Sequence, residues 1–172
     1  YSEINLPYAQ AQNIKIVRRI TGGGTVFTDE GNLMFTFISC RGQQDFADFR
    51  RFTEPILSAL RCMGIPAAFS GRHDLTIEVW KFSGNAQCRY KDKLLHHGTL
   101  MYTANTEELA KALQVREIKL KSKGVSAVKS RVTNLSGYLK TPMGIEDFRR
   151  QLFMMVMAET PGAEFFQLTA DN

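Results

Sequence analysis

The sequence predicts an α+β protein in which mixed, largely antiparallel sheets are flanked by helices. Short β-branched or apolar runs at residues 14–17 and 33–38 are typical of strands. Between residues 67 and 103, strand-like segments follow one another across short turns, so neighbours are expected to pair antiparallel. Residues 46–63 and 145–157 instead repeat apolar side chains at helical spacing. This mixture of adjacent strands and separate helices indicates the α+β class.

The composition is that of one globular domain, which we expect to span residues 1–172. The chain is 44% apolar and 23% charged. Lysine and arginine outnumber aspartate and glutamate by 22 to 17, which suits an anionic nucleotide or an acidic protein partner. The excess forms no concentrated basic stripe, and no apolar run approaches the roughly 20 residues of a membrane helix. We therefore expect neither a nucleic-acid nor a membrane partner.

The cysteines and the first residues indicate a cytoplasmic location. Cys40, Cys62 and Cys88 are odd in number and form no C-x-x-C pair, so we expect neither a disulfide framework nor a zinc site. No signal peptide is visible at the start of the chain.

A glycine cluster carries the first indication of function. Residues 14–17 predict a strand that runs into two arginines at 18–19, and the glycines at 22–24 follow. Glycine has no Cβ, so backbone amides there can point at an anion, and arginine suits phosphate or carboxylate. The stretch predicts a site for a phosphorylated small molecule, with a tight turn carrying solvated arginines as the alternative. It is neither a P-loop nor a G-x-G-x-x-G motif.

The next two elements are a strand and a helix. The nearly continuous apolar run at residues 33–38 predicts a buried strand. For the helix at 46–63, we expect Asp45 to cap the start, Gly64 to mark the end, and Pro55 to kink the helix or split off its first turn. We place its aromatic residues, from Phe46 onward, in the core.

The strand-rich region contains most of the polar candidates. Residues 75–80 alternate like one strand, which follows a turn at residues 71–74. On the next strand we expect Lys81 and Ser83 to share a face. The adjacent residues His96 and His97 should point to opposite faces, one packed and one lining a cavity.

Two helices and a basic loop complete the prediction. A helix is expected from residue 106 to 113, capped near Asn105 or Thr106, and residues 119–129 form a basic loop. The last helix, at 145–157, should stop at Pro161-Gly162.

Read in order, five segments resemble motifs of the lipoate–protein ligase A family. They are RRITGGGTVFTD (18–29), GRHDL (71–75), KFSGNA (81–86), LHHGTLM (95–101) and KLKSKGVSAVKSRVTNL (119–135). The match covers residues 3–135 with similar gaps. The resemblance implies a class II synthetase-like or biotin–lipoate ligase-like catalytic domain that activates lipoate (or octanoate) with ATP. It would then transfer the lipoyl group to a lysine of a lipoyl domain of a 2-oxoacid dehydrogenase complex, or of glycine cleavage H protein.

The resemblance also implies roles for individual residues. Lys81 would be the catalytic residue, in contact with both the lipoate carboxylate and the nucleotide phosphate. The other nucleotide-binding positions would be Arg19, Gly22, Gly23, Gly24, Thr25, Val26, Phe27 and Lys123. The lipoate-binding positions, besides Lys81, would be Gly84, Ala86, His97 and Gly98. Adenylate-forming sites usually hold Mg²⁺ on the phosphates, and Asp74 would be its protein ligand.

Two substitutions and the ends of the match depart from the family pattern. Thr28 and His73 stand where the family has His and Asn. The chain starts at a segment that is internal in family members, so we expect it to lack upstream strands and a C-terminal accessory domain.

Other functions remain open at this stage. Octanoyl or lipoyl transferases of the same superfamily use a cysteine thioester, but no cysteine follows the LHHGTLM segment, and Cys88 precedes it. Biotin protein ligases carry an arginine-glycine repeat loop that is not seen here. A non-enzymatic module that binds nucleotide or lipoate is the alternative from a different class.

Overall fold

The computed structural model describes residues 2–40, 46–113, 132–159, 162 and 164. Five strands form one antiparallel sheet in the order β1-β5-β4-β3-β2. The strands are β1 (Asn32–Ser39), β2 (Ala68–Ser70), β3 (Asp74–Ile77), β4 (Trp80–Tyr90) and β5 (Lys93–Met101). The structure confirms the α+β class and the antiparallel pairing predicted between residues 67 and 103.

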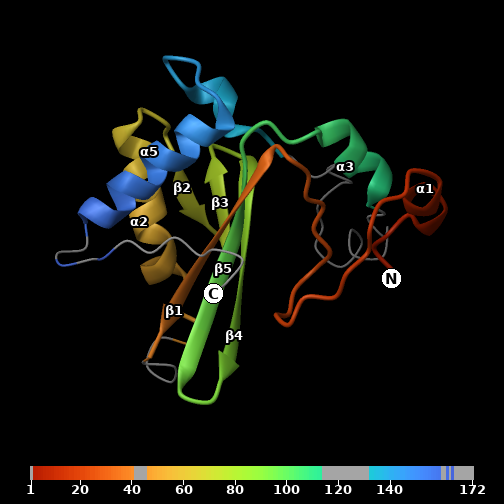
Figure 1. Ribbon diagram of the computed structural model, residues 1–172, viewed down its shortest axis with the longest axis horizontal. Coiled ribbons are helices and arrows are strands. Elements are labelled where there is room, and N and C mark those ends of the chain that lie inside the picture. The colour runs from red at the N-terminus through yellow and green to blue at the C-terminus, as the bar shows by residue number, and fades with distance from the viewer. Residues whose placement is uncertain (1, 41–45, 114–131, 160–161, 163, 165–172) are drawn as a thin grey trace.

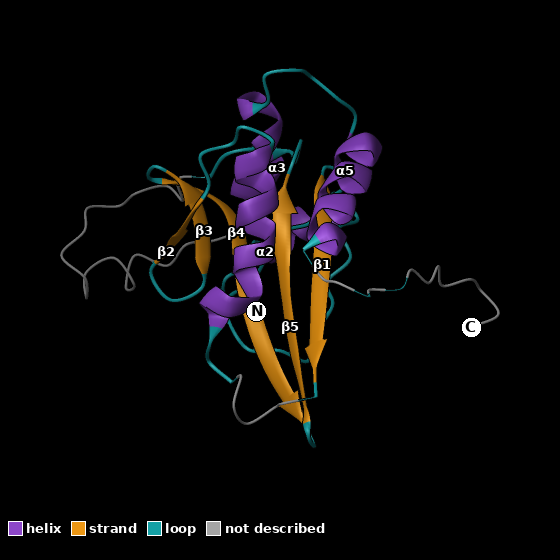
Figure 2. Cartoon of the chain, turned by 90° about the vertical axis from the view of Figure 1, so that its left-hand side faces the viewer, coloured by secondary structure: helices purple, strands orange, loops and turns teal. Residues whose placement is uncertain are grey.

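The helices lie on opposite sides of this sheet (Figure 1). Helices α2 (Phe49–Cys62) and α5 (Ile145–Ala158) lie side by side in front of the strands (Figure 2). The short helices α1 (Leu6–Ala11) and α3 (Thr106–Ala112) lie beyond the opposite face, and a 3₁₀ turn, η1, spans Leu135–Tyr138. The main core lies between the sheet and the α2–α5 pair, with buried residues such as Leu57, Phe82 and Phe148.

Helices α2, α3 and α5 form largely where the sequence predicts them. Helix α5 ends at Ala158, and the Asn105 side chain caps α3 by accepting from the amides of Glu107 and Glu108. No helix in the described part of the chain is long and apolar enough to cross a bilayer.

Helix α2 differs from its prediction at its start, and of the two outcomes predicted for Pro55 the structure contradicts the loss of the first turn. It begins at Phe49, where Asp48 rather than Asp45 accepts the amide hydrogen of Arg51 at 3.1 Å. Phe46 therefore lies before the helix and is 53% exposed rather than in the core. Helix α2 also runs through Pro55 without losing its first turn. Gly64 follows the helix with φ +83°, as expected of a residue that ends one.

Three strand predictions need correction. Residues 14–17 form no strand, because no ladder of backbone hydrogen bonds joins them to another described strand, although Ile14 N–H donates to Ala9 O at 2.8 Å. Strand β1 is not buried on both faces as predicted, because burial alternates along it, and Met34 and Ile38 on one face are 60% and 66% exposed. Residues 75–80 are two strands, since Glu78 has φ +52° in the two-residue turn that joins Ile77 to Trp80.

Candidate active site

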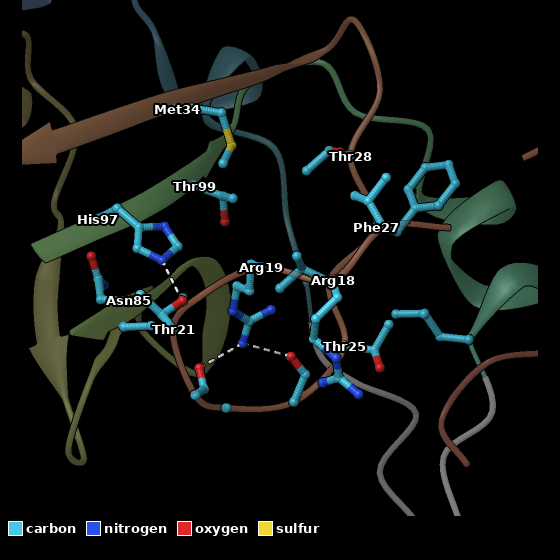
Figure 3. A pocket seen from close by; sticks show the side chains of 18 of the residues that line it. Arg18, Arg19, Thr21, Thr25, Phe27, Thr28, Met34, Asn85, His97 and Thr99 are labelled. Atoms are coloured by element: carbon cyan, nitrogen blue, oxygen red, sulfur yellow. Dashed lines mark hydrogen bonds between the residues drawn. The ribbon is translucent and has the colours of Figure 1, made fainter. Parts of the chain in front are cut away.

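A cavity of about 710 Å³ lies between the sheet and the segment that carries the glycines. Strand residues Met34, His97 and Thr99 contribute to one wall (Figure 3). The other wall is the extended stretch from residue 14 to residue 28. The volume lies within the range of about 300–1,000 Å³ that is usual for small-molecule sites.

The glycine loop is held in shape by its own arginine. The Arg19 Nη2 atom donates to the carbonyl oxygens of Gly22 and Gly24, both at 2.8 Å (Figure 3). Gly23 has φ +107°, and a Cβ there would lie 2.7 Å from Arg19 Nη2. The loop therefore needs glycine at position 23 both for its backbone conformation and for the close approach of the guanidinium group.

A carboxylate holds the far end of this loop. Glu3 Oε2 accepts the backbone N–H of Thr25 at 2.7 Å. The segment that carries Glu3 is itself fixed to α3, since Asn5 N–H donates to Ala112 O at 2.9 Å and Tyr8 Oη donates to Glu108 Oε2 at 2.7 Å. The N-terminal segment thus supports the glycine loop.

His97 connects the loop to the sheet. Its Nε2 atom lies 2.7 Å from Thr21 Oγ1, immediately before the glycines (Figure 3). Burial, with a smaller contribution from the positive Arg19, lowers the pKa of His97 below its ordinary value of 6.5. The imidazole is therefore neutral at pH 7. As expected, the paired histidines face opposite ways, with His96 fully buried and His97 lining the cavity.

Lys81 lies at the cavity wall within a small cluster of charged and polar groups. Its Nζ atom is 2.7 Å from Asp74 Oδ1, and His73 Nδ1 is 3.1 Å from the same oxygen. The structure therefore brings the predicted catalytic lysine together with the predicted metal ligand. Asp74 itself does not line the cavity, whereas His73 and Lys81 do.

The prediction that Lys81 and Ser83 share a face is wrong. Lys81 is opposite Thr76 and Ser83 is opposite Leu75, so the pairing register shifts by one residue between them. Because neighbouring residues on β3 face opposite ways, this bulge turns Lys81 and Ser83 to opposite faces. Ser83 is 1% exposed, while the Lys81 side chain is 41% exposed.

All but one of the other predicted site residues in the described part of the chain line the cavity. Those that do are Arg19, Gly22, Gly23, Gly24, Thr25, Val26, Phe27, Gly84, Ala86 and His97. Thr28, which stands where the family pattern has His, also lines the cavity. Gly98 is not among the lining residues. A Cβ on Gly98 would lie 2.3 Å from Asn85 Oδ1 and 2.5 Å from Phe35 Cζ, so packing accounts for this glycine. Lys123 and the whole predicted basic loop, residues 119–129, lie outside the described residues.

Three residues that the sequence did not single out support the site. Glu3 and Thr21 hold the glycine loop as described above. Asn85 is 7% exposed and donates from both its backbone N–H and its Nδ2 to the His73 carbonyl oxygen, at 3.0 and 2.9 Å. These bonds tie the turn at residues 71–73 to β4. Residue spacing does not predict such contacts, because each contact joins segments that are distant in sequence.

The donor groups of the described residues limit how a metal ion could bind. Among the described residues, no group of three or more His, Cys, Asp or Glu side chains is arranged to hold an ion. Within the described residues, Lys81 and His73 both contact Asp74 through the same carboxylate oxygen, Oδ1. A single carboxylate suits Mg²⁺ that arrives on a nucleotide, since this ion usually takes one or two protein carboxylates plus phosphate oxygens and water.

Comparison with known proteins gives consistent matches. The model of the lipoyl protein ligase A/B catalytic domain matches residues 1–155. Lipoate–protein ligase 1 of Staphylococcus aureus is 41% identical over 170 residues, which is 99% of this chain and 52% of that protein. Lipoate–protein ligase LplJ of Bacillus subtilis is 42% identical over 150 residues, or 87% of this chain and 45% of that protein. The chain thus spans about half the length of these curated relatives.

A solved structure extends the similarity to the fold. A bi-partite lipoate protein ligase from Thermoplasma acidophilum, described with its E2 lipoyl domain, superposes with a TM-score of 0.80 at 27% identity. The match covers 98% of this chain and 67% of that one.

Proposed function

We propose a reaction for this chain from one premise: the chain belongs to the lipoyl protein ligase A/B catalytic domain family. The reaction is ATP-dependent activation of lipoate to lipoyl-adenylate, followed by transfer of the lipoyl group to a lysine of a lipoyl domain. The observation that carries the proposal is the position of Lys81. Lys81 lines the cavity whose other side is the glycine loop.

In the first step, a lipoate carboxylate oxygen attacks the α-phosphorus of ATP and pyrophosphate leaves. The two reactants are both anions, so a fixed cation between them offsets their repulsion and stabilises the charge of the transition state. Lys81 is the residue proposed to supply this cation. Backbone amides of the glycine loop, which Arg19 holds in shape, are proposed to bind the nucleotide phosphates with little reorganisation during the reaction.

In the second step, the acceptor lysine attacks the acyl carbonyl carbon and AMP leaves. The acyl chain needs an apolar slot, to which Ala86, Met34 and Phe27 contribute side chains. Lys123 is proposed to help exclude water from the adenylate, as the family resemblance implies.

Asp74 is the proposed protein ligand for Mg²⁺, with the remaining ligands from phosphate and water. Bound there, the ion would neutralise phosphate charge. The proposed acceptors are lipoyl domains of 2-oxoacid dehydrogenase complexes or glycine cleavage H protein. The Thermoplasma ligase described with an E2 lipoyl domain supports the first of these.

The product formed on this chain tests the proposal. Incubation with lipoate, ATP and Mg²⁺ should yield lipoyl-adenylate, detected by mass spectrometry, and Cys88→Ser should yield it equally well. Acyl transfer from a carrier thioester without ATP, with an acyl group trapped on Cys88, would instead make the chain a transferase. Binding of ATP and lipoate without formation of any product would indicate that the chain is a non-enzymatic binding module.

A further inference from the structure

The β-bulge in β4 decides which groups surround Lys81. Without the extra residue, the pairing of Leu75 with Ser83 would continue in regular register and place Lys81 on the opposite face from Asp74. With the bulge, Lys81 shares a face with Asp74 and Gly84, and Phe82 is buried in the core. Bulges commonly re-aim a side chain beside an active site.

The backbone of Lys81 is fixed from both sides. On one side it pairs with Thr76 of β3. On the other, Thr133 N–H donates to Lys81 O at 2.9 Å, and Val132 forms a parallel bridge to Lys81. The peptide that carries the lysine is therefore held within the sheet, and only the side chain retains freedom.

Within the described part of the chain, the head group of Lys81 pairs with Asp74. Asp74 Oδ1 lies 2.7 Å from Nζ, and the side chains are 34% and 41% exposed. The carboxylate is itself oriented by His73 Nδ1 at 3.1 Å, while Asn85 holds the His73 carbonyl. A lysine stem is flexible, so a fixed carboxylate restricts the ammonium group to one region of the cavity wall.

We propose that Asp74 is a positioning residue that holds the Lys81 ammonium group where it meets the substrate carboxylate. This inference rests on the proposed function, because it takes lipoate as the anion that Lys81 receives. It assigns Asp74 a role that needs no metal, since the ion pair exists between protein groups alone. The role therefore acts on lipoate binding before any nucleotide arrives.

Binding measurements with lipoate and its neutral amide, lipoamide, separate this role from that of a metal ligand. Both are titrated calorimetrically into the chain in EDTA without nucleotide. Asp74→Asn should weaken lipoate binding about tenfold and change lipoamide binding less than about twofold. In a Lys81→Ala background, Asp74→Asn should have no further effect. Glu54→Gln, which removes an ion pair of similar exposure between Glu54 and Arg61 on α2, is the matched control and should bind lipoate like the wild type.

Three results would overturn the inference. Asp74→Asn would bind lipoate as the wild type does, would bind it more tightly because the carboxylate merely competes for Lys81, or would lose affinity equally with and without Lys81. A wild type that binds lipoate no better than lipoamide would instead contradict the proposed function, so the two failures are distinguishable.

Discussion

His96 shows how a single buried side chain makes this fold sensitive to acid. Its ring lies 5.0 Å from that of Phe52 and 5.6 Å from that of Phe49, measured between centroids, and Gln87 Nε2 lies 3.1 Å from its Nδ1. Burial, followed by the charge of His97, lowers the pKa of His96 from 6.5 to about 4. The folded state therefore holds this proton less tightly than the unfolded chain does.

The contribution of His96 to stability is complete above about pH 6.5 and is lost as the pH falls toward about 4. The loss approaches about 3 kcal/mol, because each unit of pKa corresponds to about 1.4 kcal/mol. Urea unfolding at pH 7 and pH 4.5 should show this term in the wild type, and His96→Phe should lose less stability on acidification. An equal loss in both proteins would mean that other groups control the acid sensitivity.

Gly98 tests whether packing or ligand contact explains a glycine of the LHHGTLM segment. Gly98→Ala should destabilise the fold by about 1–3 kcal/mol, since its Cβ would overlap Asn85 and Phe35. Gly137→Ala is the control, because no atom lies within 4 Å of a Cβ there. Chemical denaturation measures both. If Gly98→Ala kept the stability of the wild type but lost lipoate binding, contact with the ligand rather than packing would explain this glycine.

At the scale of elements, the glycine loop combines two requirements that can be separated. Gly23 adopts φ +107° and lies against Arg19, whereas a Cβ on Gly22 would meet nothing within 4 Å. An alanine at position 23 costs about 1–2 kcal/mol in backbone strain and displaces the arginine. We expect Gly23→Ala to weaken ATP binding at least tenfold and Gly22→Ala less than about threefold. Similar effects of the two changes in equilibrium binding would show that the loop conformation is unimportant.

The elements also show which features could be predicted from the sequence. Helix α5 and strand β5 follow strong local periodicity, and the sequence predicts them well. The start of α2 was misplaced because Asp45 and Asp48 are both good capping residues. Residues 14–17 have strand propensity but no partner strand, which propensity alone does not supply. The bulge at Phe82 is likewise set by tertiary pairing, so the sequence wrongly predicts that Lys81 and Ser83 share a face.

At the scale of the whole molecule, the cavity joins three separate parts of the chain. The N-terminal segment supports the glycine loop through Glu3, and the sheet contributes His97 and Lys81. Most of the residues that the motifs from the glycine loop and the sheet single out for the site line this one cavity. Contacts such as those of Glu3 and Asn85 required the structure, since their partners are distant in sequence.

The central claim is that Lys81 stabilises the transition state of lipoate adenylation. The most direct measurement is lipoate-dependent exchange of labelled pyrophosphate into ATP, compared between the wild type and Lys81→Ala. Circular dichroism first checks that the two proteins are folded alike. The account predicts exchange that requires lipoate and that falls about a hundredfold or more in the variant, since a charged donor at a transition state is worth about 3 kcal/mol. Exchange by Lys81→Ala within about threefold of the wild type would contradict it.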